Sequence, residues 1–227
     1  MTRVAAAKKE QKPLAVRAGR PPRELAGEVD ERILDAARQM FLERGLMGAS
    51  IDEIARLARA GKPTIYARFP TKEALFIAVG MRNAASVRTR YGRDYATAGE
   101  TIEERLVSLG TDILRSLLVS DVIDFMRLSA SEARRIPELV NLGRTSRREA
   151  AKAVYKALSE VAQAEDVNVF PALSADRLPV TTQLFMDLIV GRFLMRALVG
   201  EDLKVLRAEI AQHVELSVAF FLAGCRQ

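Results

Sequence analysis

Apolar residues recur at helical spacing along most of the chain, and the pattern is most informative from Glu31 to Leu75. Ser50 precedes one apolar stripe, and Glu53 lies three positions later, which predicts a capping box at the start of a helix. The stripe has intervals of three and four and consists of Ile51, Ile54, Ala55 and Ala58. A break follows, and Pro63 suits the first turn of a second helix at about 62–68. The spacing therefore predicts a helix-turn-helix over about 50–69.

The second of these helices is too short to be stable alone, so its neighbours must hold it. Ile65 and Phe69, four positions apart, are the expected anchors. Between residues 54 and 72 the chain has no acidic residue and five basic ones, Arg56, Arg59, Lys62, Arg68 and Lys72. This excess of positive charge favours a polyanion as the partner.

Beyond residue 70 the helical period continues, with no convincing strand pattern and no internal repeat. Further helices are expected at about 71–91, 101–119, 121–134, 137–164, 179–198 and 202–222. Thr101 and Glu104 predict a capping box, Gly143 predicts a bend, and 165–176 is expected to be a loop. The fold class is therefore all-α, with about nine helices: an N-terminal three-helix unit that contains the helix-turn-helix and a larger C-terminal helical domain.

The distribution of charge separates a third region. The formal net charge of the 227 residues is +6, and all of it is carried by residues 1–23, which hold seven basic residues and one acidic residue. Low apolar content predicts that this arm is disordered. We expect an arm at 1–23, a DNA-binding domain at 24–87 and a regulatory domain at 88–227.

The sequence lacks the residues that several classes of function require. His213 is the only histidine and Cys225 the only cysteine, so the chain has no intrachain disulfide and no set of ligands for a typical metal centre. No glycine-rich phosphate loop is present, and we predict neither an enzyme nor a cofactor. The N-terminus lacks a secretory apolar run, and Asp187, Arg192 and Arg196 interrupt the most apolar stretch, which predicts a cytoplasmic protein without a membrane span.

The segment from about Glu28 to Met81 resembles the DNA-binding domain of the TetR family of bacterial transcriptional regulators. The matching positions are Ile33, Ala36, Ala37, Phe41, Gly45, Ser50, Ile54, Ala55, Ala58, Thr64, Ile65, Tyr66, Phe69, Lys72, Glu73, Ala74 and Leu75. Four positions depart from the family pattern. Arg59 replaces the usual turn glycine, Ala60 the usual valine, and Gly61 the usual hydroxyl cap. Arg68 stands where many members have histidine or tyrosine. A glycine cap costs only a few tenths of a kcal/mol relative to serine, so the fold is expected to survive.

The resemblance implies how this segment meets DNA. Ser50, Tyr66 and Lys72 are expected to contact phosphates. The residues expected to face the major groove are Lys62, Pro63, Thr64 and Arg68. This division agrees with physical chemistry, because ammonium and hydroxyl groups hold a phosphate while the first residues of a recognition helix reach base edges. The alternative is that Tyr66 only packs and the arginines form a solvated face.

Within the arm, Arg20 lies in a short Arg-Ala-Gly-Arg-Pro-Pro segment. Glycine and proline allow an extended backbone to lie deep in a minor groove while arginine reads its narrow, negative A·T-rich form. A plain polybasic tail that adds nonspecific affinity is an equal alternative.

The C-terminal half is similar, more loosely, to the AefR-like C-terminal domain of part of the TetR family. The similarity rests on Phe125–Leu128, Glu132–Arg135, Pro137–Leu139 and Phe193–Leu198. Members with this domain are typically repressors, so the resemblance implies a repressor that a ligand releases from a palindromic operator.

Two apolar stripes near the C-terminus indicate an interaction surface. One, on the helix at 179–198, includes Leu184, Leu188, Gly191 and Met195; the other, at 202–222, includes Leu206, Ile210, His213, Ser217 and Phe220. Both could merely pack on their own domain. With the family resemblance we favour a homodimer, since a two-fold dimer reading two half-sites gives a very short recognition helix useful affinity.

A ligand site is harder to locate. Aromatic and methionine side chains suit a flexible pocket for a small apolar effector. The candidates are Met81, Leu114, Phe125, Met126, Tyr155, Phe185, Met186 and Phe193, although each could equally be ordinary core. The remaining alternative function is a helical protein that binds nucleic acid without sequence preference, or lipid.

Overall fold

The computed structural model describes residues 23–91, 98–164 and 169–226. Within these residues it has ten α-helices, one short 3-10 helix and no strand. The helices are α1 Arg23–Gly48, α2 Ile51–Ala58, α3 Lys62–Arg68, α4 Lys72–Tyr91, α5 Ile102–Leu117, α6 Ser120–Glu132, α7 Glu138–Gln163, the 3-10 helix Pro171–Leu173, α8 Leu178–Leu198, α9 Leu203–Ala208 and α10 Ile210–Cys225. The all-α prediction is confirmed. The arm at 1–22, with Arg20, lies outside the described residues.

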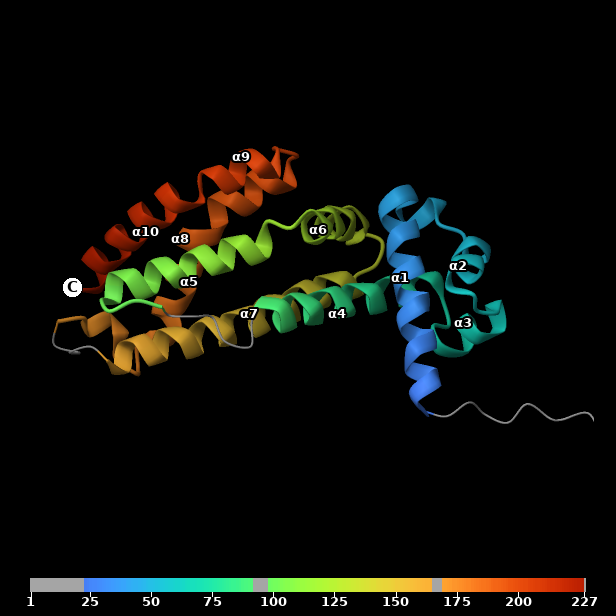
Figure 1. Cartoon of the computed structure of the whole chain (residues 1–227), viewed down its shortest axis with the longest axis horizontal. Helices are drawn as coiled ribbons and strands as arrows, with labels where there is room; N and C mark the ends of the chain where they lie inside the picture. Colours follow the sequence, from blue (N-terminus) through green and yellow to red (C-terminus); the bar gives the residue numbers. More distant parts are fainter. Residues whose placement is uncertain (1–22, 92–97, 165–168, 227) are drawn as a thin grey trace, which may run out of the picture.

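The molecule is elongated, with α1, α2 and α3 at one end and the remaining helices extending away from them (Figure 1). Helix α4 leaves this N-terminal unit and runs beside α7 into the body. Helix α5 packs against α8 and α10, which form the far side of the body with the C-terminus at its end. Because α4 contacts α1 at one end and α7 in the body, it links the two ends of the molecule.

Helix α1 changes direction at Gly45, where φ is 68°. This is the left-handed region, which side chains disfavour and glycine occupies freely. Leu46 after the kink is fully buried, and so are Phe41 and Ile33 before it. The glycine therefore lets both parts of α1 face the same core.

Two apolar cores fill the molecule. The larger joins α5, α7, α8 and α10 in the body. The smaller fills the N-terminal unit but is completed by three residues of the body, Phe125, Ile136 and Leu139. Phe76 of α4 stands at the junction, with its ring centroid 5.1 Å from that of Phe41 and 4.9 Å from that of Phe125. The N-terminal unit thus shares its core with the α6–α7 corner.

Most helix boundaries match the sequence prediction within a few residues, and two details differ. The helix expected over 202–222 is divided at Glu209 into α9 and α10. Helix α7 is one continuous helix across Gly143, where a bend was expected. The capping box of Thr101 and Glu104 is confirmed, and its backbone N–H groups hold the pKa of Glu104 below its ordinary value.

Among the described residues, one helix resembles a membrane span in length and composition alone. Helix α8 is long and apolar enough by length and composition, with a mean hydropathy of 1.3 over its most apolar window. Asp187, Arg192 and Arg196 do not prevent this, because the most apolar window carries at most two charged residues. One such helix is weak evidence, because core helices of soluble proteins pass the same test. Phe185, Ile189 and Phe193 bury one face of α8 in the body core.

Candidate DNA-binding surface

Helices α2 and α3 meet at the tight turn that their sequence predicts. The hydroxyl of Ser50 accepts a hydrogen bond from the Asp52 backbone N–H at 3.2 Å. Arg59 ends α2 in the left-handed conformation, with φ 50° and ψ 44°. Its N–H donates to the Arg56 carbonyl at 3.3 Å, and the Ala60 N–H donates to the Ala55 carbonyl at 3.0 Å. Arg59 therefore occupies the conformation for which a glycine is usual, and the turn still closes.

The capping box expected at Ser50 is only half formed. Glu53 does not reach back to Ser50; its two carboxylate oxygens accept from the Arg44 guanidinium of α1 at 2.8 and 2.9 Å. Glu53 thus forms an ion pair with the positively charged Arg44 in place of a hydrogen bond to the neutral Ser50 N–H. Glu53 consequently fixes α2 against α1.

Helix α3 shows one buried and one exposed face. Ile65 is fully buried and Phe69 is half-buried, as expected of its anchors. Lys62 and Pro63 are exposed, Tyr66 is 46% exposed, and Thr64 is half-buried. Gly61 precedes the helix without a side-chain cap. The first turn of α3 and Tyr66 therefore lie open on one surface.

The two basic residues of α3 have acidic partners. Lys62, at the start of the helix, forms an ion pair with Asp52 of α2. Arg68, at its end, forms an ion pair with Asp30 of α1 and donates to the Thr64 carbonyl at 3.3 Å. No local pattern predicts the contact with Asp30, which links residues 38 positions apart. In this structure Arg68 is turned back toward α1.

Lys72, at the start of α4, reaches the turn between α1 and α2. Its ammonium donates to the carbonyls of Met47 at 3.2 Å and Ala49 at 3.1 Å. Because Ala49 precedes Ser50, the positive charge lies beside the N-terminal end of α2, where free N–H groups and the helix dipole also favour an anion. Ser50 and Lys72, two of the expected phosphate contacts, are thus brought together.

Other basic residues join elements in ways that local patterns do not reveal. Arg32 of α1 donates to the Ala58 carbonyl at the end of α2 at 3.2 Å. Arg38 of α1 forms an ion pair with Asp121 of α6, between the N-terminal unit and the body. Arg127 of α6 donates to the Ala197 carbonyl near the end of α8.

The residues expected to line a ligand pocket are not brought together. Leu114, Phe185 and Phe193 are fully buried in the body core, with Met186 packed against it. Phe125 belongs to the other core. Met126 is half-buried, while Met81 and Tyr155 are 60% and 38% exposed. Aromatic and methionine content alone did not distinguish core from surface.

An exposed apolar face covers the outer side of α8 and α10. On α8, Leu184 and Met195 are exposed, as is Gly191, and Leu188 is half-buried. On α10, Phe220 is 74% and Leu216 is 66% exposed. The exposed apolar residues of α8 and α10 are thus candidates for contact with a second copy.

Three of the residues expected on this face lie elsewhere. Leu206, Ile210 and Ser217 are buried within their own chain. Helix α10 is apolar nearly all round, so spacing could not separate its inner stripe from its outer one. We correct these three positions: the outer stripe of α10 is Leu216 and Phe220, which the spacing argument assigned only in part.

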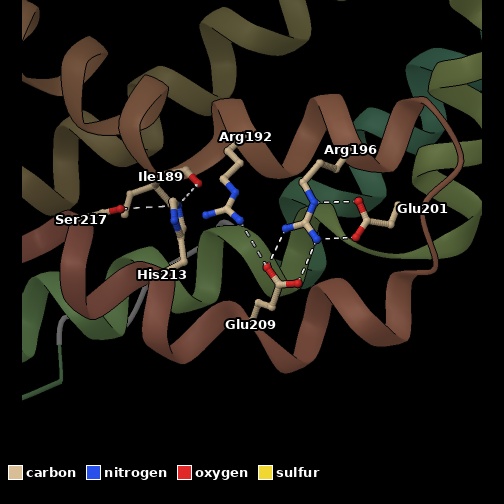
Figure 2. A network of polar contacts seen from close by, with 7 residues as sticks. All are labelled: Ile189, Arg192, Arg196, Glu201, Glu209, His213 and Ser217. Atoms are coloured by element: carbon tan, nitrogen blue, oxygen red, sulfur yellow. Dashed lines mark hydrogen bonds and ion pairs between the residues drawn. The ribbon is translucent and has the colours of Figure 1, made fainter.

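His213 lies between the inner and outer stripes, where it links α10 to α8. Its Nε2 is 3.0 Å from the Ile189 carbonyl oxygen and 3.5 Å from the Ser217 hydroxyl (Figure 2). Its ring centroid is 4.8 Å from that of Phe193. The contacts of His213 therefore join α10 to α8, which is a structural role.

A charged network closes the turn between α8 and α9. The Arg196 guanidinium donates to the carboxylates of Glu201 and Glu209, and Arg192 lies 3.7 Å from Glu209 (Figure 2). Hydrogen bonds from Arg196 hold the pKa values of Glu201 and Glu209 below their ordinary range. The same bonds raise the pKa of Arg196.

Comparisons with known proteins agree with this architecture. Residues 33–79 match the model of the bacterial regulatory proteins of the tetR family, and residues 104–225 match that of the C-terminal domain of AefR-like transcriptional repressors. The chain is 42% identical over 57 residues to the transcriptional activator FasR of Mycolicibacterium smegmatis, a match that covers 24% of this chain and 26% of that protein.

Two solved structures extend the likeness over most of the chain. A TetR-family regulator from Mesorhizobium loti has a TM-score of 0.77 at 21% identity, covering 88% of this chain and 97% of the other. The flavonoid-responsive regulator FrrA has a TM-score of 0.68 at 28% identity, covering 88% and 98%. The match to FasR thus spans about a quarter of each chain, whereas the likeness in fold to these two structures covers 88% of this chain.

Proposed function

Because the chain belongs to the TetR family of bacterial regulatory proteins, with an AefR-like C-terminal domain, we propose that it is a cytoplasmic, ligand-released repressor. In this proposal it binds a palindromic operator as a homodimer. Regulators of this family bind DNA through the N-terminal helix-turn-helix. The contacts, the partner copy and the ligand are the parts that we infer for this chain.

The position of Lys72 supports the DNA contact most directly. Its ammonium lies beside Ser50 at the N-terminal end of α2, held by the Met47 and Ala49 carbonyls. A phosphate there would meet a positive charge, a hydroxyl and free backbone N–H groups. On the same unit, α3 exposes Lys62, Pro63 and Tyr66 for base and backbone contacts.

The first test compares binding of the purified chain to DNA upstream of its own gene with binding to random DNA of equal length at physiological salt. We expect a preference of about 10³-fold or more. Tyr66→Phe, which removes one exposed hydroxyl, should weaken binding to both DNAs alike. Tyr155→Phe, an exposed tyrosine on α7, is the matched control and should change neither.

Equal affinity for both DNAs would contradict a regulator that acts at its own promoter. A genome-wide search for bound fragments then separates a distant operator from the alternative of a sequence-indifferent nucleic-acid-binding or lipid-binding protein.

The proposed dimer interface is the outer face of α8 and α10. Leu184, Met195, Leu216 and Phe220 are all at least 60% exposed, and exposed apolar side chains that gather on one face mark interaction sites. Gly191 supports close approach of a second helix, since nothing lies within 4 Å of the position of its missing side chain. A glycine inside an exposed helix otherwise costs about 1 kcal/mol.

Sedimentation of charge variants tests the interface. Leu184→Glu and Phe220→Glu should convert a dimer into a monomer with unchanged helical content, because each places a charge in a desolvated contact. Val140→Glu on α7 starts from a residue that is also exposed, at 44%, and should leave the dimer intact. A dimer in all three variants would refute this face.

We infer that release follows binding of a small apolar effector in the body and a shift of α4. Helix α4 contacts both α1 and α7, and its Phe76 ring stacks on Phe125 of α6. A movement of helices in the body would therefore displace α4 and, through it, the DNA-binding unit. FrrA is described as flavonoid-responsive, which agrees with an effector of this class.

Reciprocity tests this mechanism. A coupling of about 1–3 kcal/mol, or 5- to 150-fold in affinity, is typical. Once an effector is found by screening for operator release, operator DNA must weaken its binding by the same factor. An unchanged effector affinity in the presence of operator would rule out release by linkage.

A further inference from the structure

Asp52 introduces a negative charge at the surface that we propose for reading DNA. It lies in the first turn of α2, its side chain is 63% exposed, and it forms an ion pair with Lys62, whose side chain is 54% exposed. Lys62 is the first residue of α3. The N-terminal ends of the two helices therefore present a carboxylate and an ammonium side by side.

The helix itself does not require this carboxylate to point toward α3. Ser50 already caps α2, and Glu53 also supplies an acid in its first turn. Successive positions on a helix are about 100° apart, so the two acids face different neighbours. Glu53 binds Arg44 of α1, whereas Asp52 faces Lys62.

We propose that Asp52 is a specificity-determining residue, which with Lys62 reads one G·C base pair in each half-site. The inference rests on the proposed function. An ammonium donates to the O6 and N7 acceptors of guanine, and a carboxylate accepts from the N4 amino group of cytosine. On the major-groove edge of a G·C pair the guanine acceptors lie next to the cytosine amino group. An ammonium beside a carboxylate can therefore bind both bases at once.

The same carboxylate acts against nonspecific binding. On a random sequence the Lys62 ammonium would serve as a phosphate contact, and each such contact strengthens binding and steepens its salt dependence. Asp52 opposes this use of Lys62, because it already holds the ammonium and is itself repelled by phosphate. One residue thereby raises affinity for the correct base pair relative to all other DNA.

Asp52→Asn and Glu53→Gln form a matched pair for the test. Both remove one negative charge from the first turn of α2, so they change the net charge and the helix-dipole interaction alike. Only the first removes the partner of Lys62. The full chain and each variant are used to select binding sites from randomised duplex DNA, and their affinity for random DNA is measured over a range of salt.

The wild type and Glu53→Gln should select the same half-site. Asp52→Asn should lose its preference at one G·C pair, by about 5- to 150-fold in relative affinity, and should bind random DNA more tightly with a steeper salt slope. Lys62→Gln should lose preference at that same pair but weaken binding to random DNA. The conservative Asp52→Glu should restore part of the preference.

The outcomes separate this inference from the proposed function. If the wild type selects a half-site and Asp52→Asn selects the same one, Asp52 does not read DNA and the inference fails alone. If Asp52→Asn and Glu53→Gln change binding equally, only net charge matters and the inference also fails. If the wild type selects no site, the proposed function fails.

Discussion

At the scale of single residues, several charged side chains bind partners that lie far away in the sequence. Lys72 reaches back to the Met47 and Ala49 carbonyls, and Arg68 pairs with Asp30. Residue type and spacing predicted that these cations lie near the turn, but not that Arg68 is held by α1. A contact between separate elements depends on tertiary packing, which a local pattern does not encode.

Arg59 offers a test of local strain. Left-handed backbone costs an L-residue about 1–2 kcal/mol, and Arg59 adopts it with φ 50°. Arg59→Gly should therefore raise the free energy of unfolding by up to about 1 kcal/mol, after the greater freedom of glycine in the unfolded chain is subtracted. Urea unfolding without DNA measures the difference.

Ala60→Gly is the control for that measurement. Its position does not have positive φ, so glycine there only adds freedom to the unfolded chain and should lower stability by about 0.4–1 kcal/mol. Equal losses in both variants would mean that Arg59 is not strained.

At the scale of elements, apolar periodicity predicted the helices well and their orientation less well. The starts of α2 and α5 follow from Ser50 and Thr101, whose side chains cap them. In α10 the same periodicity has two solutions, because apolar residues occupy both faces. Ile210 was therefore assigned to the wrong side of α10, and Leu206, which lies in α9, is likewise buried. Only the packing within the chain resolves both positions.

The Arg196 network gives the α8–α9 turn a predictable pH dependence. The folded-state pKa values of Glu201 and Glu209 are lowered by Arg196. The stability that these two carboxylates contribute is therefore present above the unfolded-state pKa of about 4.3. It is lost as the pH falls through their folded-state pKa values. Arg196→Met should lower the melting temperature at pH 7, and the loss should shrink toward pH 3.

Circular dichroism melts at a fixed protein concentration provide the measurement. Arg192→Met removes a more exposed arginine that lies 3.7 Å from Glu209 and should have a smaller effect at pH 7. A penalty for Arg196→Met that does not depend on pH would show that packing, not charge, accounts for it.

At the scale of the whole molecule, the two ends are joined by a shared core and by the Arg38–Asp121 ion pair. The sequence predicted two units linked by the helix over 71–91, yet it did not predict that Phe125, Ile136 and Leu139 complete the core of the first unit. These residues were considered only as parts of the body. Because α6 and α7 contribute buried residues to both cores, the boundary between the units is a packed surface.

Phe125→Ala should expose this coupling. Truncation of a buried phenylalanine costs about 3–5 kcal/mol, and here the lost contact is with Phe76. Hydrogen exchange should show that amides of α1 and α4 lose protection together with those of α6. Phe185→Ala, in the body core, should affect α1 less, and equal effects on α1 would contradict a local coupling.

The shared core also limits how such a regulator can be engineered. A biosensor built by grafting residues 23–91 onto the ligand-binding half of a relative would carry Phe76 without the Phe125 ring on which it stacks. The graft would leave an apolar cavity at the joint and weaken the signal from ligand to promoter. A working hybrid must bring the α6–α7 corner with the DNA reader, so the exchangeable module is discontinuous in the gene.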